Sequence, residues 1–590
     1  MPGYFCKSSV NEFQDMVNWQ AAQRVALVTF ITGFFTSYNI SFAQEIPQTG
    51  YPKGYFRDPL DLPIHLAGNY GELRPGHFHM GLDMKTNGRE NYPVYAAADG
   101  YVSHIKIEPS GFGNAIYINH PNGYTTVYVH LNTFFPALGQ YVKRQQYGME
   151  QWEVFLDVPE NLFPVKKGDL IAYSGNTGGS MAPHLHFEVR DTKTDENRNP
   201  ILFGLPVIDD VPPTLQRVGV YDGNESTYLQ IPHLYSLAKT AEGYSVPGGL
   251  VTTHSNRVRL AIGAVDHQTG SASTLGIYSA AVSLDGQPVS GFVLDGFGYE
   301  STRYVNAHID YGLKTSGGPF LEYLSALPGS PLPIYHDENE DGLLHLDDEF
   351  PHTVVIEVRD GYGNASTAKF KIRKAGPDPI YDQGSTFLPN QVNVFENSEF
   401  LLYLPVHCLY DEARPVFVQK GTVELAAASP VYNLISALVP AQDSFTVSIK
   451  PTIDLTPGET DRYLILQKGA GKEHVSKVIW NKGWATARLR DFGDFQLIRD
   501  NIPPVINPLG WHDGSNLKGK GLISVSVKDN YGVFGDFRGE LDGKWIMFSQ
   551  RGDVYTYHMD EHFPEGEHML VLSVADEAGN ITRKTYHLSR

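Results

Sequence analysis

The chain has 590 residues, too many for one hydrophobic core, so its length predicts about four domains. Hydrophobic residues make up 41% of the chain and charged residues 19%, a balance that is typical of globular proteins and excludes wholesale disorder. The formal net charge of -20 disfavours binding to nucleic acid or to anionic lipid, because both are polyanions.

The N-terminal segment predicts an export signal. An arginine precedes the apolar stretch "VALVTFITGFF" (25–35), which is short for a membrane span, and the small-residue pattern "SFA" (41–43) follows it. A buried core helix is the alternative interpretation of the apolar stretch. We expect residues 1–43 to be a signal peptide, with either Met1 or Met16 as the true start. With no later segment long and apolar enough to span a membrane, the protein is predicted to be exported to the periplasm or cell envelope.

Residues 44–206 predict a domain built of short strands. The runs "NAIYINH" (114–120) and "YTTVYVHL" (124–131) flank the turn "PNG" and predict a β-hairpin. The stretch 132–170 looks like an insertion with some helical character, and "HLHFEVR" (184–190) predicts a further strand. The abundance of aromatic residues, Gly and Pro agrees with a mainly β protein.

Two similar junctions, "DDVPPTLQ" (209–216) and "DNIPPVIN" (500–507), introduce a repeated pattern. Each is followed by apolar-alternating strands, an Asp-rich turn and a closing Asp-x-x-Gly-Asn turn, which predicts immunoglobulin-like β-sandwiches at 207–375 and 500–590. Residues 376–499 predict a β-rich module of unknown type. We expect these modules to position the first domain or to bind protein partners.

The stretch "GHFHMGLDM" (76–84) concentrates polar groups that suit a metal ion. If it is extended, His79, Gly81 and Asp83 project to the same face, because strand side chains alternate, and Gly81 leaves room for an ion. The alternative is a pair of solvated or hydrogen-bonded polar residues on an ordinary turn.

The same alternation applies to the other histidine-rich strands. It places His184, His186 and Glu188 on one face of the strand at 184–190, and it pairs His130 with Tyr128. The groups that a folded β-domain would bring together are His79, Asp83, His130, His184 and His186. Two imidazoles and one carboxylate suit a catalytic zinc ion with a fourth position left for water, whereas structural zinc is closed by four ligands, usually including Cys.

Three segments resemble the lysostaphin-type (LytM-like) zinc metallopeptidases, peptidase family M23. They are "GELRPGHFHMGLDMKT" (71–86), "YVHL" (128–131) and "GNTGGSMAPHLHFEV" (175–189), in the order expected of that family. The resemblance covers about residues 50–205 and implies an antiparallel β-sheet peptidase domain with the duplicated hybrid motif.

The resemblance also implies roles for individual residues. His79, Asp83 and His186 would bind zinc, and His130 and His184 would be catalytic histidines beside the metal, with the division of roles between them left open. The implied reaction is hydrolysis of a peptide bond in the stem peptides or cross-links of peptidoglycan by a zinc-activated water. The alternatives are a non-catalytic cell-wall-binding or regulatory protein, and a peptidase that acts on proteins outside the wall.

Other polar residues near these motifs receive less specific interpretations. His77 shares a face with His79 and is expected at the surface or behind the ligands, and His120 at the hairpin turn is expected to be structural. Arg74 is expected to be a surface arginine, with binding of a substrate carboxylate as the alternative. The insertion at 132–170 could shape or cover the cleft, which leaves substrate specificity open.

A second metal motif starts at Asp337. The pattern Asp-x-Asn-x-Asp-Gly-x5-Asp ends at Asp348 and resembles a calcium loop, except that Asp replaces the usual Glu at the twelfth position. Strand-like flanks favour an acidic hairpin turn over a calcium site here.

Overall fold

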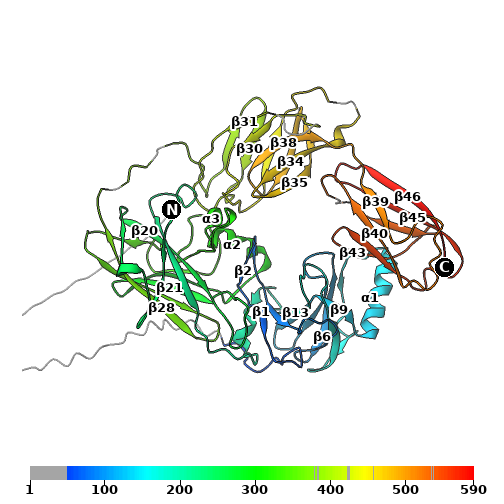
Figure 1. Ribbon diagram of the computed structural model, residues 1–590, viewed down its shortest axis with the longest axis horizontal. Helices are drawn as coiled ribbons and strands as arrows, with labels where there is room; N and C mark the ends of the chain where they lie inside the picture. Colours follow the sequence, from blue (N-terminus) through cyan, green and yellow to red (C-terminus); the bar gives the residue numbers. More distant parts are fainter. Residues whose placement is uncertain are drawn as a thin grey trace, which may run out of the picture. The chain divides into compact units, whose positions relative to one another are not determined.

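The computed structural model describes residues 50–377, 379–381, 384–421, 426–455, 458–532, 535 and 537–590, and the predicted signal peptide lies outside them. Residues 51–590 form one compact unit. Strands dominate this unit, which confirms the mainly β prediction (Figure 1). No helix in the described ranges is long and apolar enough to cross a membrane.

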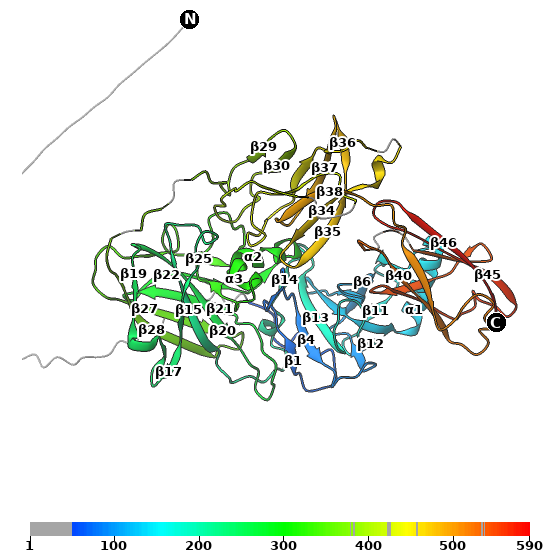
Figure 2. The ribbon, with the colours of Figure 1, turned by 45° about the horizontal axis from the view of Figure 1, so that its top comes forward.

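The first part of the unit is organised around one large antiparallel sheet. Its central strands follow the order β1–β4–β13–β8–β7–β6–β10, and Figure 2 shows β1, β4 and β13 side by side. The strands of this path are β1 (Leu66–Gly68), β4 (Leu82–Lys85), β13 (His184–Asp191), β8 (Tyr124–Val129), β7 (Asn114–Asn119), β6 (Gly100–Ile107) and β10 (Val154–Asp157). β7 and β8 form the predicted hairpin.

Smaller elements complete this part. The additional strands and helices are β2 (Leu73–Arg74), β3 (His77–Phe78), β5 (Pro93–Tyr95), β9 (Leu131–Phe134), β11 (Pro164–Val165), β12 (Leu170–Ser174), β14 (Asn197–Arg198), α1 (Pro136–Met149) and the 3-10 helix η1 (Pro200–Phe203). α1 and β10 account for much of the insertion at 132–170, so its predicted helical character is confirmed.

The hydrophobic core lies on one face of the large sheet. Leu185, Phe187 and Val189 of β13 belong to this core, which also contains Val94 of β5 and Ile171 of β12 from a three-stranded sheet. The alternate residues of β13 therefore point to the other face, as the alternation predicts.

Two details of the predicted alternation are wrong. The stretch 76–84 is not one strand, because β3 ends at Phe78 and β4 begins at Leu82. His130 does not share a face with Tyr128, because the backbone of His130 is left-handed, with φ of 61°, and turns the chain after β8. Tyr128 is buried against Phe187 in the core instead.

Residues 207–375 contain two sheets around a common core. The first contains β16 (His233–Ser236), β15 (Thr214–Asp222), β20 (Arg257–Val265), β24 (Glu322–Tyr323) and β26 (Leu344–His345). The second contains β17 (Ala238–Thr240), β18 (Gly243–Ser245), β19 (Leu250–Thr253), β28 (Ala365–Lys374), β27 (His352–Arg359), β21 (Ser279–Leu284), β22 (Gln287–Val293) and β25 (Tyr335–Asp337). The connecting elements are η2 (Pro247–Gly249), β23 (Gly296–Phe297), η3 (Tyr299–Tyr304), α2 (Val305–His308) and α3 (Tyr311–Thr315).

The last two modules also consist of paired sheets with a core of their own. In residues 376–499 the first sheet consists of β29 (Asn393–Glu396), β30 (Phe400–Leu404), β33 (Phe445–Ile449), β37 (Trp484–Leu489) and β36 (Ile479–Asn481). The second sheet consists of β31 (Val418–Lys420), β32 (Val431–Asn433), β38 (Asp494–Arg499), β34 (Tyr463–Gly469) and β35 (Lys472–Lys477). The module also contains the 3-10 helix η4 (Thr460–Arg462). In residues 500–590 the first sheet consists of β39 (Val505–Leu509), β40 (Leu522–Lys528), β44 (Val554–His558) and β43 (Phe548–Arg551). The second sheet consists of β42 (Lys544–Trp545), β41 (Arg538–Leu541), β45 (Glu567–Ala575) and β46 (Ile581–Ser589). The immunoglobulin-like type and the domain boundaries stay predictions.

The predicted boundary at residue 206 does not separate two independent cores. Tyr70, Phe78 and Met80 belong to the core of the sandwich at 207–375. β14 pairs with β23, so backbone hydrogen bonds also join the two parts.

Candidate metal centre

Three of the predicted ligands meet at one point. His79 Nε2 lies 3.0 Å from Asp83 Oδ1 and 2.9 Å from His186 Nδ1, and His186 Nδ1 lies 2.9 Å from Asp83 Oδ1. All three residues are buried. Antiparallel pairing of β4 with β13 places Asp83 directly opposite His186. His79 lies in the connection between β3 and β4.

The far side of each imidazole is fixed by a protein acceptor. His79 Nδ1 donates to the carbonyl oxygen of Asn69 at 2.7 Å, which leaves Nε2 to face the centre. His186 Nε2 lies 3.0 Å from Glu188 Oε1, which leaves Nδ1 to face the centre. Partners of this kind set the tautomer and orientation of metal-binding histidines.

These residues fit a zinc ion. Tetrahedral coordination with bonds of about 2.0–2.2 Å separates neighbouring ligand atoms by about 3.3 Å, and the three donor atoms already lie near that spacing. The donor set is two imidazole nitrogens and one carboxylate oxygen, which is the chemistry that zinc accepts. His79, Asp83 and His186 would therefore hold the ion.

The other two predicted histidines lie beside this triangle. The rings of His130 and His184 are 4.7 Å apart between centroids, and His184 Nε2 is 3.3 Å from Asp83 Oδ1. His130 Nδ1 donates to the Thr177 carbonyl at 2.8 Å, and His184 Nδ1 donates to the Ala182 carbonyl at 2.8 Å. Each ring thus keeps Nε2 as the nitrogen that is not bound to the backbone.

The Gly-rich turn after β12 positions His130. Gly178 has φ of 67°, and a Cβ there would lie 2.2 Å from the backbone nitrogen of Gly113. Only glycine allows this approach of the two turns, and the neighbouring Thr177 then presents its carbonyl to His130.

Gly81 serves a different purpose from the predicted one. A Cβ at Gly81 would lie 2.5 Å from the carbonyl oxygen of Phe187 and 2.8 Å from His186 Nε2. This nitrogen faces Glu188 rather than the centre. Gly81 therefore makes room for the His186 ring and the strand beside it, and not for the ion.

Burial and nearby carboxylates set the protonation of the histidines. Burial lowers the pKa of His79 to about 4 and the pKa of His130 to about 3, so both rings are neutral near pH 7. Burial also acts on His186, but hydrogen bonds to Asp83 and Glu188 outweigh it and raise the pKa of His186 to about 9. The carboxylates around His186 thus favour positive charge at the centre, which a divalent cation would supply.

A buried group behind His186 was missed by the sequence analysis. Arg190 Nε donates to Glu188 Oε2 at 2.8 Å, and the Tyr299 hydroxyl of η3 donates to Glu188 Oε1. The Arg190 guanidinium also lies 4.9 Å from the centre of the Tyr299 ring. Strand alternation predicted that Glu188 shares a face with His186. No sequence pattern links Glu188 to Tyr299, which is 111 residues away.

The remaining polar residues named in the sequence analysis, Arg74, His77 and His120, lie in different surroundings. The Arg74 guanidinium lies 2.5 Å from Asp83 Oδ2, while its side chain is still 31% exposed; the two interpretations of this residue stay predictions. His77 is exposed, with Nδ1 3.2 Å from the carbonyl oxygen of Pro75. His120 is buried, with Nδ1 2.8 Å from the carbonyl oxygen of Asp99.

The acidic loop at 337–348 is occupied by ion pairs. Asp341 contacts Arg257 at 2.5 Å and His345 at 3.0 Å, while Asp348 contacts His352 at 3.0 Å. The predicted hairpin turn is wrong, because the flanking strands do not pair with each other: β25 pairs with β22, whereas β27 pairs with β21 and β28.

The centre opens into a cleft of about 850 Å³. Its wall includes Asp83, His130 and His184, and a loop of the next module, residues 270–272, completes it. In the part of the chain that the structure describes, none of the lining residues comes from 132–170.

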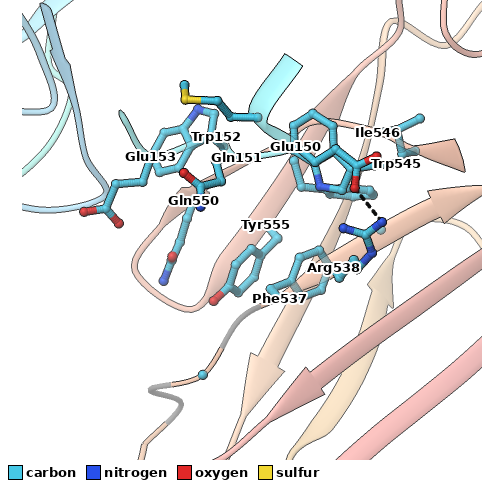
Figure 3. Close-up of a pocket in the computed structure, with 14 residues that line it drawn as sticks. Glu150, Gln151, Trp152, Glu153, Phe537, Arg538, Trp545, Ile546, Gln550 and Tyr555 are labelled. Carbon is cyan, nitrogen blue, oxygen red and sulfur yellow. Dashed lines mark hydrogen bonds and ion pairs between the residues drawn. The ribbon is translucent and has the colours of Figure 1, made fainter. Parts of the chain in front are cut away.

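The insertion borders a different cavity instead. The residues that follow α1 face the last module, where Glu150 pairs with Arg538 at 2.7 Å across a cavity of about 670 Å³ (Figure 3). Lys143 of α1 also pairs with Asp560 at 2.9 Å. The insertion therefore contacts residues 500–590 and does not cover the cleft at the centre.

Known proteins resemble this part of the chain. The model of peptidase family M23 matches residues 77–147, and that of a Zu5-like domain matches residues 385–500. An uncharacterized metalloprotease of Haemophilus influenzae is 32% identical over 145 residues, which cover 23% of this chain and 25% of that protein. The peptidoglycan DD-endopeptidase ShyA of Vibrio cholerae is 34% identical over 143 residues, which cover 23% of this chain and 27% of that protein.

A solved structure matches over the same region. The catalytic domain of the antimicrobial peptidase lysostaphin from Staphylococcus simulans is 26% identical and covers 26% of this chain and 93% of that chain, with a TM-score of 0.16. The likeness to peptidase family M23 rests on the sequence matches. The chain spans about a quarter of the length of the curated relatives it matches.

Proposed function

Since the chain carries a domain of peptidase family M23, matched at residues 77–147, we propose that it is a zinc metalloendopeptidase that hydrolyses peptide bonds of peptidoglycan. The observation that carries this proposal is the triangle of His79 Nε2, Asp83 Oδ1 and His186 Nδ1, with sides of 2.9–3.0 Å. The substrate class is supported by relatives named as peptidoglycan DD-endopeptidases. A signal peptide at 1–43 would export the protein to the periplasm or cell envelope.

Zinc, when bound, lowers the pKa of a coordinated water and polarises the scissile carbonyl. The chain contributes His130 and His184 as the acid–base groups. With Nδ1 committed to a backbone carbonyl, each ring offers Nε2 for proton exchange with the substrate. A neutral ring accepts a proton from the attacking water, and a protonated ring stabilises negative charge on the carbonyl oxygen or donates to the leaving amine.

The wall of the cleft supplies the means to position a peptide. Ser271 of the next module lies at the cleft, and its hydroxyl accepts a hydrogen bond from Lys85 at 3.1 Å. Substrate specificity would therefore depend on residues outside the peptidase domain as well as on those inside it. The second function considered, a wall-binding protein without activity, would retain the cleft but not need the paired histidines.

The test is digestion of purified peptidoglycan by residues 44–590 loaded with zinc, with the soluble products identified by mass spectrometry. New peptide ends should appear, and their masses would name the bond that is cut. His186→Ala should lose both zinc and activity, because it removes one ligand atom. His184→Ala should keep the zinc and lose activity.

A matched control separates the site from a general effect of losing a histidine. His104 lies on β6 of the same sheet and contacts Asp157 rather than the centre, so His104→Ala should retain both zinc and activity. Intact muropeptides from a zinc-loaded wild type would refute the peptidoglycan substrate, and full activity of His184→Ala would refute its catalytic role.

A further inference from the structure

Two groups of three aspartates lie outside the peptidase centre. In each group, one ligand atom from every residue lies within 4.8 Å of the others. The first group, here called the front triad, consists of Asp209, Asp266 and Asp360. The second, the rear triad, consists of Asp500, Asp529 and Asp576.

The two triads occupy equivalent places in their modules. Asp209 lies in the connection that enters the first strand, β15, and Asp500 lies in the connection that enters β39. Asp266 directly follows β20, the partner of β15, and Asp529 directly follows β40, the partner of β39. In both modules the third aspartate follows a strand of the opposite sheet, β27 or β45.

The surrounding hydrogen bonds are repeated as well. Asn364 Nδ2 donates to Asp360 Oδ2 at 2.6 Å and contacts the Asp209 carbonyl at 3.3 Å. Asn580 Nδ2 donates to Asp576 Oδ2 at 2.7 Å and contacts the Asp500 carbonyl at 3.2 Å. The same arrangement has therefore been built twice in one chain.

Negative charge in the triads has no protein counter-charge. Within the described residues, no nitrogen of Lys, Arg or His lies within 4.0 Å of any of the six carboxylates. The acidic loop at 337–348 differs in this respect, because the guanidinium of Arg257 pairs with Asp341.

Two buried oxygens in the front triad lack a hydrogen-bond partner. Asp266 is only 2% exposed, and its Oδ1 has no hydrogen bond, as is also true of Asp209 Oδ2. Burial and the carboxylates of Asp360 and Asp209 raise the pKa of Asp266 to about 7. In the rear triad Asp529 Oδ1 is likewise buried without a partner. Buried polar atoms are rarely left unsatisfied in proteins, so these oxygens point to a ligand.

We propose that the front triad and the rear triad each bind a calcium ion. Calcium accepts six to eight oxygen ligands and prefers carboxylates, carbonyls and water, whereas zinc favours nitrogen and sulfur. The ion would tie the connection that enters each module to both of its sheets. It would thus fix the start of the sandwich at 207–375 and of the module at 500–590.

Stoichiometry tests the proposal directly. Residues 44–590 with one equivalent of zinc are dialysed against radioactive calcium, and two calcium ions should be retained per chain. Asp266→Asn and Asp529→Asn should each retain one ion, and the double variant none. Asp348→Asn, in the acidic loop that resembles a calcium motif, should retain both. Failure of the folded wild type to retain calcium, or two ions retained by the double variant, would overturn the proposal.

The same experiment identifies the ion. A tenfold excess of magnesium should leave calcium bound, because magnesium requires a smaller octahedral site and gives up its water reluctantly. Displacement by an equal concentration of magnesium would overturn the assignment to calcium.

Stability provides a readout that an acidic cluster without an ion would not give. Without calcium, Asp266→Asn should stabilise the fold, since it removes repulsion between carboxylates and keeps an oxygen for the His267 N–H. At 5 mM calcium the wild type should become more stable than the variant. A dissociation constant of about 10⁻⁴ M would favour the folded state about fifty-fold per site. A variant that is more stable under both conditions would refute the ion.

Discussion

Protonation of His120 should destabilise the protein in mild acid. His120 follows β7 at the hairpin whose second strand leads to His130, and it is 6% exposed. Its Nδ1 donates to the Asp99 carbonyl at 2.8 Å, and its Nε2 lies 2.8 Å from Thr126 Oγ1. Burial lowers the pKa of His120 to about 4, compared with about 6.5 in an unfolded chain.

The sign and the size follow from these two values. Between pH 6.5 and 4 the unfolded chain binds a proton at His120 and the folded chain does not, so the free energy of unfolding falls as the pH falls. The stabilisation is complete above pH 6.5 and is lost as the pH approaches the folded pKa. From pH 7 to pH 4.5, this one group should remove about 2 kcal/mol.

Urea unfolding of the wild type and of His120→Gln at both pH values measures this contribution. Glutamine keeps a donor and an acceptor but does not titrate, so the variant should lose about 2 kcal/mol less than the wild type on acidification. His104→Gln, on β6, serves as the control for removing a histidine from the same sheet. Equal acid sensitivity of His120→Gln and the wild type would refute the claim that His120 is held neutral by burial.

Three further substitutions test the packing around the centre. Gly81→Ala places a methyl group 2.8 Å from His186 Nε2, so it should cost about 1–3 kcal/mol and lower the zinc content of the purified protein. Tyr299→Phe removes a hydrogen bond to Glu188 and should weaken zinc affinity about tenfold, measured by competition with a chelator. Phe187→Ala empties a fully buried site in the core and should cost about 3–5 kcal/mol in urea unfolding. An unchanged value in any of these assays would contradict the corresponding contact.

The strand alternation made much of the centre predictable from the sequence. β13 carries His184 and His186 on one face and Phe187 on the other, so period two alone described this strand correctly. The same rule failed at His130, because a left-handed residue after β8 reverses the direction of the side chain. A non-glycine residue with positive φ leaves no regular trace in the pattern of apolar residues.

Contacts between distant segments could not be predicted at all. The sequence contains the Asp-rich turns at Asp266 and Asp360, and the repeat was recognised, but only the fold shows that they face Asp209 across two sheets. Arg74 illustrates the same limit, since its pairing with Asp83 depends on the β2–β3 hairpin and not on a spacing along one strand.

The peptidase domain should not fold normally without the module that follows it. Tyr70, Phe78 and Met80 are at most 1% exposed and pack in the core of residues 207–375, so a chain that ends at residue 206 would uncover them. Each side chain would forfeit about 1.5–3 kcal/mol of burial. Thr302 also binds both the amide and the carbonyl of Phe78, next to the ligand His79. Residues 44–206 should therefore bind zinc more weakly than residues 44–375 and unfold at lower urea. Equal zinc affinity and stability of the two fragments would show that the shared core is dispensable, and that the centre depends on β4 and β13 alone.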